Sequence, residues 1–402
     1  MRTTEQATTT LNPNDHLRSL FLLDPALAFL NHGSFGACPH PVFEEYQQWQ
    51  REFERSPVEN HARKFADLMR TAREDLGRFI NADPLDLVFV ANATVGVHIV
   101  ARSLELGPGD EVLTTDHEYG ACDRMWEFLR RKHGFVLNRV EIPVPVTTQP
   151  DIVQRVVEGM NDQTKVLFIS HITSPTALTL PVEELCQIAR ERGIITLIDG
   201  AHSIGQIDLD FQKINPDFFT SNLHKWLCAP KGSAFLYARQ EMQKLLHPLV
   251  VSWGWEPEDE GDSEFIDHHE YQGTREAAPA LATGAAINFQ REHDWPSVRE
   301  RCHELVVKAR SELSTRFGFI ALSPNSPEWF VQMCAFLLPE HVDGHLLQQR
   351  LFDEYRVEIP VFDWNGKQII RISIQGYNTQ DDLERLFQGI AEILPELASE
   401  AM

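Results

Sequence analysis

The sequence predicts an α/β protein built on a mainly parallel sheet. Short apolar runs, such as 165–170 and 194–198, alternate with segments of helical length, which is typical of strands covered by helices on both faces. Glycine and proline mark the boundaries, as in the Gly-Pro-Gly-Asp segment 107–110. At 402 residues, with 43% hydrophobic and 24% charged residues, the chain is long enough for two folded domains.

In the first part of the chain, an apolar strand is expected at 87–90, followed after 91–96 by a helix to about residue 106. A later helix should begin at Leu180, because Pro181 is favoured in a first turn, and it should end near residue 192 before Gly193. The other strands expected in this region are 111–114, 165–170, 194–198, 217–220 and 233–237. In such sheets ligands bind at the carboxyl ends of the strands.

The C-terminal third has a different pattern and predicts a smaller α+β domain. The expected elements are a helix at about 296–316, an apolar strand at 330–337, a helix at 345–355, strands at 357–361 and 368–374, and an amphipathic helix from about residue 380.

The composition excludes several classes of partner. A formal net charge of −23 argues against nucleic acid and against an anionic membrane surface. No apolar run is as long as a membrane span, and the first twenty residues lack the apolar stretch of a signal peptide. The cysteines have no CxxC spacing, so we expect reduced thiols in a cytoplasmic protein; they are Cys38, Cys122, Cys186, Cys228, Cys302 and Cys334.

Two short segments together indicate a cofactor site. Asp199 ends an apolar run, and Lys225 follows in the segment Ser-Asn-Leu-His-Lys-Trp. Either residue alone has an ordinary structural explanation, a turn aspartate or a surface lysine. Together they supply the two groups that pyridoxal 5′-phosphate requires: a lysine for the Schiff base and a carboxylate that keeps the pyridine nitrogen protonated.

Several further motifs carry a family resemblance. They are Phe29–Gly36 (FLNHGSFG), Asp199–His202 (DGAH), His224–Trp226 (HKW), Pro230–Gly232 (PKG), Gly273–Arg275 (GTR), Arg371–Ser373 (RIS) and Tyr377-Asn378. With these motifs spread over nearly the whole chain, the sequence resembles the class V aminotransferase family of fold-type-I pyridoxal phosphate enzymes, which includes cysteine desulfurases. Within that family it is most similar to the isopenicillin N epimerase-like branch.

The resemblance implies the fold and its division into domains. We expect the α/β fold of fold-type-I pyridoxal phosphate-dependent transferases, with a mainly parallel seven-stranded sheet in a large cofactor-binding domain over residues 41–285. A smaller α+β domain should occupy residues 286–402. The N-terminal segment 1–40 should contribute to the small domain and to the active site.

The resemblance also implies roles around the cofactor ring. Lys225 resembles the Schiff-base lysine, and Asp199 resembles the partner of the ring nitrogen. His202 stands where desulfurases have a glutamine that contacts the ring oxygen, and imidazole can donate the same hydrogen bond. Tyr119 aligns with the residue that stacks on the ring, although it could also be an ordinary core aromatic. Ser174 aligns near an asparagine beside the ring.

Other residues are expected to bind the phosphate and the substrate. Ala93 and Thr94 would offer donors at a helix start, and Asn222 and His224 would add donors from the lysine segment. Thr274 would reach the phosphate of a neighbouring subunit, which implies a homodimer with shared active sites.

Arg371 resembles the arginine that binds the substrate carboxylate through two parallel hydrogen bonds. Its alternative, a surface salt bridge, is disfavoured because the strand around it is apolar. Asn31 and His32 are further substrate-binding candidates, and His32 is also a speculative proton donor.

Two features narrow the chemistry. Desulfurases carry a nucleophilic cysteine shortly before this arginine, but residues 354–370 contain none. Cys334 is expected on a core strand, so sulfur transfer through a persulfide is disfavoured. Cys38 is only a remote candidate for such a nucleophile.

Adjacent His268 and His269 would diverge on a strand, so we expect no metal site. The acidic run 256–264 is expected to be a solvated loop near the pocket, flanked by Trp253 and Trp255.

The sequence thus favours an enzyme that acts at the α-carbon of an amino acid or amino-acid-containing small molecule. An epimerase-like reaction is the leading hypothesis, with Lys225 as the base and Tyr119 as a proton donor on the opposite face. A C–S lyase is the closest alternative, because elimination needs only the lysine and a leaving group, and an aminotransferase is another. A regulator or scaffold that keeps the fold without the reaction is the non-enzyme alternative.

Overall fold

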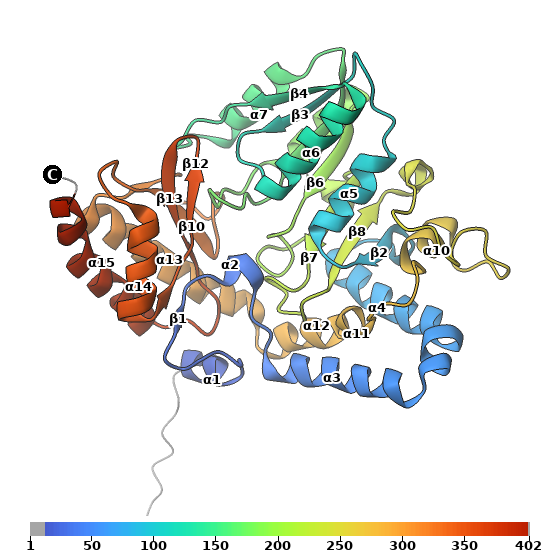
Figure 1. The fold of residues 1–402 in the computed structure, drawn as a ribbon, viewed down its shortest axis with the longest axis horizontal. Coiled ribbons are helices and arrows are strands. Elements are labelled where there is room, and N and C mark those ends of the chain that lie inside the picture. Colours follow the sequence, from blue (N-terminus) through green and yellow to red (C-terminus); the bar gives the residue numbers. More distant parts are fainter. Residues whose placement is uncertain (1–12, 401–402) are drawn as a thin grey trace, which may run out of the picture.

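The computed structural model describes residues 13–400, and its larger sheet has seven strands in the order β2-β8-β7-β6-β5-β3-β4. The strands are β2 (Leu87–Val90), β3 (Glu111–Thr115), β4 (Val136–Val140), β5 (Thr164–Ser170), β6 (Ile195–Asp199), β7 (Phe218–Asn222) and β8 (Ala234–Ala238). The pairs from β4 to β7 are parallel, whereas β8 runs antiparallel to both β7 and β2. The expected mainly parallel seven-stranded sheet is confirmed (Figure 1).

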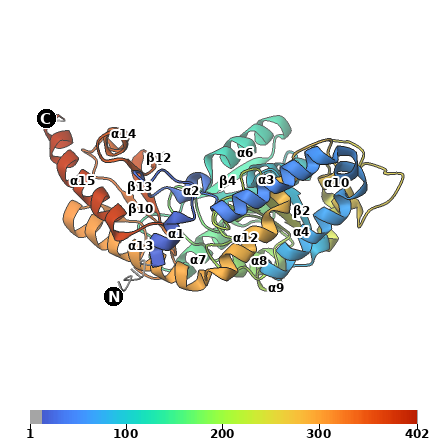
Figure 2. The same cartoon turned by 90° about the horizontal axis from the view of Figure 1, so that it is seen from below.

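Helices cover both faces of this sheet. Helices α5 (Ala93–Ser103) and α6 (Gly120–His133) lie on one face, and α7 (Gln149–Gly159), α8 (Val182–Glu191) and α9 (Phe211–Ile214) lie on the other (Figure 2). The sheet is therefore buried on both sides, and every residue of β2, β3, β7 and β8 is buried. This explains why these strands are continuous apolar runs in the sequence.

A second helical layer packs at the β2 edge of the sheet. It contains α3 (His40–Arg55), a π-helical turn η1 (Glu59–Arg63), α4 (Phe65–Ile80), α10 (Glu264–Glu270), α11 (Ala278–Leu281) and α12 (Thr283–Glu292), and short 3-10 turns η2 (Pro84–Asp86) and η3 (Gln240–Leu245) lie nearby. His268 and His269 are in α10, so their expected placement on a strand is wrong. Ser263 caps this helix by accepting a hydrogen bond from the backbone N–H of Ile266, a start signal that outweighs the short apolar run.

The C-terminal elements form a separate cluster on one side of the molecule (Figure 1). A four-stranded sheet has the order β12-β13-β10-β9, from β9 (Ile320–Ala321), β10 (Met333–Leu337), β12 (Val361–Trp364) and β13 (Lys367–Ser373). It packs with helices α13 (Trp295–Phe317), α14 (Gly344–Tyr355) and α15 (Gln380–Glu400). Within residues 13–400, no helix is both long and apolar enough to cross a membrane.

The strand expected at 357–361 is in fact two strands. Residues Val357–Glu358 form β11, which pairs in parallel with β1 (Ala28–Phe29), and the chain then enters β12 in the other sheet. Pro360 lies between them, and proline lacks the N–H that a continuous strand would need to donate.

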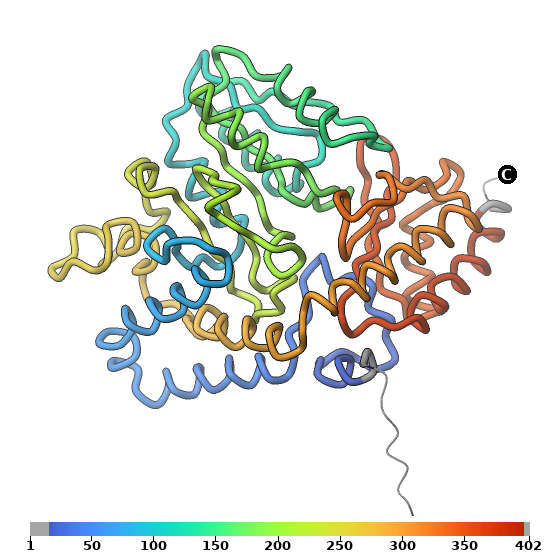
Figure 3. Tube along the Cα trace, turned by 180° about the vertical axis from the view of Figure 1, so that it is seen from behind, coloured from blue at the N-terminus to red at the C-terminus, as the bar shows by residue number. Residues whose placement is uncertain are grey.

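The N-terminal segment joins the two parts of the chain. The first twelve residues of the expected segment 1–40 lie outside the described residues; α1 (Pro13–Ser19), β1 and α2 (His32–Phe35) follow. The trace in Figure 3 shows this segment running beside the C-terminal domain before α3 crosses to the large sheet. After β1, Asn31 forms an isolated bridge with Ser373 of β13.

Gly36 allows the N-terminal segment to pack closely against the backbone of His224 and Lys225 in the large domain. Its backbone has φ 70° and ψ 163°, a region that is essentially restricted to glycine. A Cβ atom built there would collide with the backbone carbonyl of His224, next to Lys225. The side chain of Lys231 also donates to the Gly36 carbonyl at 2.9 Å.

We expect Gly36→Ala to destabilise the protein by roughly 3 kcal/mol or more, because backbone strain and a collision with main-chain atoms add together. Gly318→Ala is the matched control: its φ is 71°, but nothing lies within 4 Å of the added Cβ, so a loss of only about 1 kcal/mol is expected. Urea unfolding of both variants measures the two losses. Equal losses would show that the contact with His224 is not tightly packed.

Candidate active site

A large cavity lies at the carboxyl ends of β5, β6 and β7 and at the start of α5. Its volume is about 940 Å³. Asp199 ends β6, Asn222 ends β7, and Lys225 is on the turn that follows β7. Nine of the residues expected from the sequence line it, namely Ala93, Thr94, Tyr119, Ser174, Asp199, His202, Asn222, His224 and Lys225. Ser34 and Phe35 of the Phe29–Gly36 motif also line it.

Lys225 and His202 face each other at the floor of the cavity. The Nζ atom of Lys225 lies 3.1 Å from Nε2 of His202, and the indole N–H of Trp226 donates to Nδ1 of the same ring at 3.2 Å. All three residues are buried. Burial lowers the pKa of Lys225 to about 7, and the nearby positive charge of Arg371 acts in the same direction. At neutral pH a substantial part of Lys225 is therefore the free amine, which is the nucleophilic and basic form.

Asp199 is a buried carboxylate with few partners. Its Oδ1 accepts from the backbone N–H of Ala201 at 2.9 Å, and its Oδ2 contacts only the thiol of Cys122 at 3.6 Å. Burial raises the pKa of Asp199, partly offset by the hydrogen bond from Ala201 and by Lys225. A protonated ring nitrogen would supply the strong donor that this carboxylate lacks.

A second buried carboxyl lies behind Asp199. Glu118 accepts hydrogen bonds from the hydroxyls of Thr115 at 2.7 Å and Ser170 at 2.6 Å. Burial raises its pKa to about 8, and the charge of Asp199 contributes in the same direction. At neutral pH Glu118 therefore holds its proton for most of the time, so it does not place a second full negative charge beside Asp199.

The start of α5, where an anion site is expected, lies at the cavity, with Ala93, Thr94 and Val95 in the lining. Asn92 caps the helix by accepting from the N–H of Val95 at 3.0 Å. The N–H of Ala93 donates to Oδ1 of Asn222 at 2.9 Å, so the side chain of Asn222 is held at the helix start with its oxygen occupied. His224 donates from Nδ1 to the carbonyl of Ser233 at 3.0 Å, and burial lowers its pKa to about 4.

Arg371 is a buried cation without an acidic partner. It is 1% exposed, and its guanidinium donates to the carbonyl of Ser174 at 2.6 Å and to the hydroxyl of Ser34 at 3.1 Å, with Oδ1 of Asn31 at 3.5 Å. It lies over the ring of Phe362, 5.0 Å from the centroid. No carboxylate in the described chain forms an ion pair with it, and its Nε has no hydrogen-bond partner. Burial lowers its pKa to about 9. An incoming carboxylate would neutralise this charge.

Four sequence-expected residues, Asn31, His32, Thr274 and Arg371, do not line the cavity, and Tyr119 lines it at an exposed position. Tyr119 lines the cavity but is 45% exposed, at the start of α6. His32 does not line the cavity: its ring accepts from the Tyr377 hydroxyl at 3.0 Å and donates to the backbone carbonyl of Lys225 at 2.9 Å, so it supports the lysine from behind. Thr274 is exposed and lies away from the cavity of its own chain.

Some residues of the site were not expected from the sequence. Trp226 donates a hydrogen bond to His202 and is the last residue of the HKW motif. Glu118 interacts electrostatically with Asp199 and directly precedes Tyr119 in the sequence. His98 and Arg102 extend the cavity wall along α5. Their spacing of four and eight residues from Thr94 places them on the same helix face, which is the signal that could have identified them.

The residues present fit pyridoxal phosphate. The cavity provides a free-amine lysine, a carboxylate that lacks a strong donor and a helix start for a phosphate. Next to it, hydrogen-bonded to Ser174 and Ser34 of the lining, the Arg371 guanidinium has no acidic partner in the described chain and could bind a carboxylate. Among the described residues, no cysteine lines the cavity. Cys334 is buried on β10, and burial raises its pKa to about 12, so it lacks the exposed thiolate that sulfur transfer requires.

Comparisons with known proteins show the family of the chain. The family model described as aminotransferase class-V matches residues 37–386. The chain is 36% identical to an isopenicillin N epimerase of Streptomyces clavuligerus, covering 95% of this chain and 98% of that protein. It is 30% identical to a probable chloroplastic L-cysteine desulfhydrase of Arabidopsis thaliana, covering 91% of this chain and 83% of that protein.

Solved structures share the fold at lower identity. A cysteine desulfurase from Escherichia coli superposes with a TM-score of 0.80 at 21% identity, covering 96% of this chain and 99% of that one. A cystine C–S lyase in complex with cysteine persulfide gives a TM-score of 0.79 at 19% identity, covering 91% of this chain and 97% of that one.

The depressed pKa of Lys225 predicts a specific pH dependence of stability in the cofactor-free protein. Between pH 7 and pH 10.5 the unfolded chain binds a proton at this lysine that the folded chain does not, so wild-type stability rises with pH across this window. Lys225→Met removes this contribution. The advantage of the variant over the wild type should therefore be largest below pH 7 and decrease by roughly 1–3 kcal/mol toward pH 10.

Urea unfolding of both proteins at several pH values gives this difference directly, and taking the difference cancels the other titrating groups. A difference that stays constant from pH 6 to pH 10 would mean that Lys225 is charged in the folded protein.

Proposed function

Because the chain belongs to the class-V aminotransferase family and is a pyridoxal phosphate-dependent enzyme, we propose that it acts at the α-carbon of an amino acid or of a larger substrate that contains one. The observation that carries this proposal is the presence in one site of Lys225, a substantial part of which is the free amine, and of the Arg371 guanidinium, which has no acidic partner among the described residues and donates to Ser174 and Ser34 of the cavity lining. A substrate that bears an α-carboxylate and an α-amino group satisfies both residues.

Each residue has a proposed part in the reaction. The bound cofactor supplies an electron sink for a bond broken at the α-carbon. Arg371 holds the substrate carboxylate, and Lys225 holds the cofactor and then takes the α-proton as the free base. Asp199 keeps the ring nitrogen protonated, and His202 donates toward the ring oxygen. Ala93, Thr94, Asn222 and His224 hold the phosphate at the start of α5, with Ser174 and Asn31 beside Arg371.

We propose an epimerase-like reaction as the leading assignment. Support comes from the 36% identity to isopenicillin N epimerase along almost the full length of both chains. Inversion needs a proton delivered to the face opposite the base, and the hydroxyl of Tyr119, an exposed residue of the cavity wall, is the proposed donor. His32 is less suited to this role, because both of its ring nitrogens are already hydrogen-bonded away from the cavity.

A C–S lyase is the second candidate, supported by the relatives described as L-cysteine desulfhydrases. Such a β-elimination would use Lys225 and Arg371 in the same positions and would need no donor on the second face. The two reactions therefore differ in their dependence on Tyr119.

A panel of amino acids incubated with the enzyme in deuterated water tests these assignments; it should include cysteine, cystine, S-substituted cysteines and peptide-linked amino acids. We expect deuterium at the α-carbon together with inversion of configuration. Release of pyruvate from sulfur substrates without inversion would overturn the epimerase in favour of the lyase, and amino transfer to a keto acid would indicate an aminotransferase.

In the same assay, Tyr119→Phe should reduce inversion by roughly 10²–10⁴-fold while exchange with retention continues, because Lys225 still removes and returns the proton. Tyr355→Phe, on the distant helix α14, is the matched control and should leave both rates unchanged. Inversion that survives in Tyr119→Phe would assign the second proton to another group.

We further propose a homodimer in which Thr274 reaches the phosphate of the partner subunit. This is supported by the exposed position of Thr274 away from its own cavity. Sedimentation of the cofactor-bound enzyme as a monomer would contradict it.

A cytoplasmic location is also proposed, because all six cysteines are free and five of them are buried thiols, as expected in a reducing compartment.

A further inference from the structure

The hydrogen bond between Trp226 and His202 has only one possible direction. An indole N–H donates and has no acceptor atom, so Nδ1 of His202 must present its lone pair to Trp226 Nε1, 3.2 Å away. A neutral imidazole carries one proton, which must then be on Nε2. That nitrogen lies 3.1 Å from Lys225 Nζ. His202 therefore donates and Lys225 accepts, which a neutral amine can do and an ammonium group cannot.

The charged and titratable groups around this pair are consistent with these protonation states. Burial and the charge of Lys225 hold the pKa of His202 well below its ordinary range, with smaller effects from Arg371, His32 and His224, so the imidazole is neutral. Around Lys225, Arg371 favours the free amine, whereas Asp199 and Cys122 oppose it less strongly than burial favours it.

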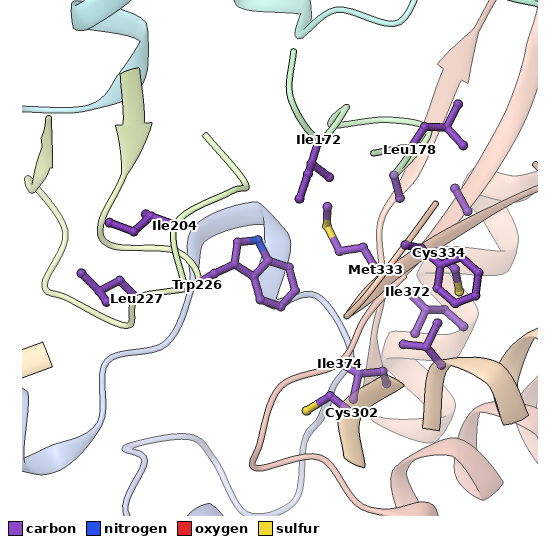
Figure 4. Close-up of a cluster of buried hydrophobic side chains, with 14 of the residues drawn as sticks. Ile172, Leu178, Ile204, Trp226, Leu227, Cys302, Met333, Cys334, Ile372 and Ile374 are labelled. Atoms are coloured by element: carbon purple, nitrogen blue, oxygen red, sulfur yellow. The ribbon is translucent and has the colours of Figure 1, made fainter. Parts of the chain in front are cut away.

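Packing leaves the indole little freedom to turn away. Trp226 is 0% exposed, and Figure 4 shows it among side chains of the large domain, such as Leu227, and of the C-terminal domain, such as Met333. The backbone carbonyl of Trp226 accepts from the Gln290 side chain at 2.8 Å. The carbonyl of His202 accepts from the Gln206 side chain at 2.8 Å, so both partners are fixed at the main chain as well.

We propose that Trp226 is a positioning residue that fixes His202 as its Nε2–H tautomer, so that the imidazole donates into the cavity and Lys225 is kept as the free base. The proposal rests on the proposed role of Lys225 and extends it to a residue that lies behind the cavity wall. Without the indole N–H, His202 could move its proton to Nδ1 and accept from a Lys225 ammonium. The free-amine fraction at neutral pH would then fall.

Nitrogen-15 NMR of histidine-labelled, cofactor-free protein tests the tautomer without any activity measurement. His202→Gln identifies the resonances of His202 by their loss. In the wild type, Nδ1 should have the shift of an unprotonated ring nitrogen and Nε2 that of a protonated one. The opposite tautomer in the wild type would overturn the proposal, whether or not any tryptophan variant folds.

The second measurement is the pH profile of the rate at which cofactor-free protein captures pyridoxal phosphate. Loss of one hydrogen bond of about 1 kcal/mol corresponds to roughly a fivefold change in the ratio of free amine to ammonium. Trp226→Phe should therefore slow capture roughly three- to fivefold at pH 7 and leave it unchanged near pH 10. In the His202→Gln background, Trp226→Phe should have no such effect, because the amide donor does not depend on a tautomer.

Trp329→Phe is the matched control for loss of indole bulk. Trp329 is also fully buried, but its N–H has no partner, so the capture profile should not move. Borohydride reduction followed by peptide mapping identifies the lysine that captures the cofactor. Capture at another lysine would contradict the proposed function, whereas capture at Lys225 with an unchanged profile in Trp226→Phe would overturn only the role of Trp226.

Discussion

The structure depends on the burial of two basic groups close together. Lys225 and Arg371 are both removed from water, and neither forms an ion pair with a carboxylate in the described chain. Such an arrangement is costly in the free protein, and Lys225 reduces the cost by giving up its proton. The remaining cost, that of the buried Arg371 charge, is recovered only when an anion binds beside it, so affinity for a carboxylate is built into the fold. Much of the surrounding hydrogen bonding serves to hold these two groups in place.

The two groups come from different parts of the chain, and their alignment depends on short contacts. Lys225 follows β7 of the large sheet, whereas Arg371 is in the middle of β13, paired with Ala335 of β10. Between them lies α2, whose Ser34 hydroxyl accepts from Arg371 and whose His32 ring donates to the Lys225 carbonyl. A four-residue helix is thus hydrogen-bonded to both sides of the cavity.

Much of this arrangement could be predicted from the sequence, for identifiable physical reasons. Continuous apolar strands gave the sheet, and Asp199 and Lys225 pointed to the cofactor because so few cofactors need both groups. The antiparallel direction of β8 and the split of 357–361 at Pro360 depend on pairing partners far away in the chain, which local patterns do not contain. The placement of His32 behind Lys225 and of Trp226 beside His202 could not be foreseen either, because a motif gives residue types in order but not the direction in which each side chain points.

The pairing of β1 with β11 has a mechanical consequence. Through it, α2 is attached to the C-terminal domain, while Gly36 and His32 attach the same helix to the turn that carries Lys225. A rotation of one domain against the other would have to break one of these attachments, at a cost of about 1 kcal/mol for each hydrogen bond. These attachments therefore restrain the distance between Lys225 and Arg371. A molecule that binds both residues must have a matching spacing between its α-carbon and its carboxylate.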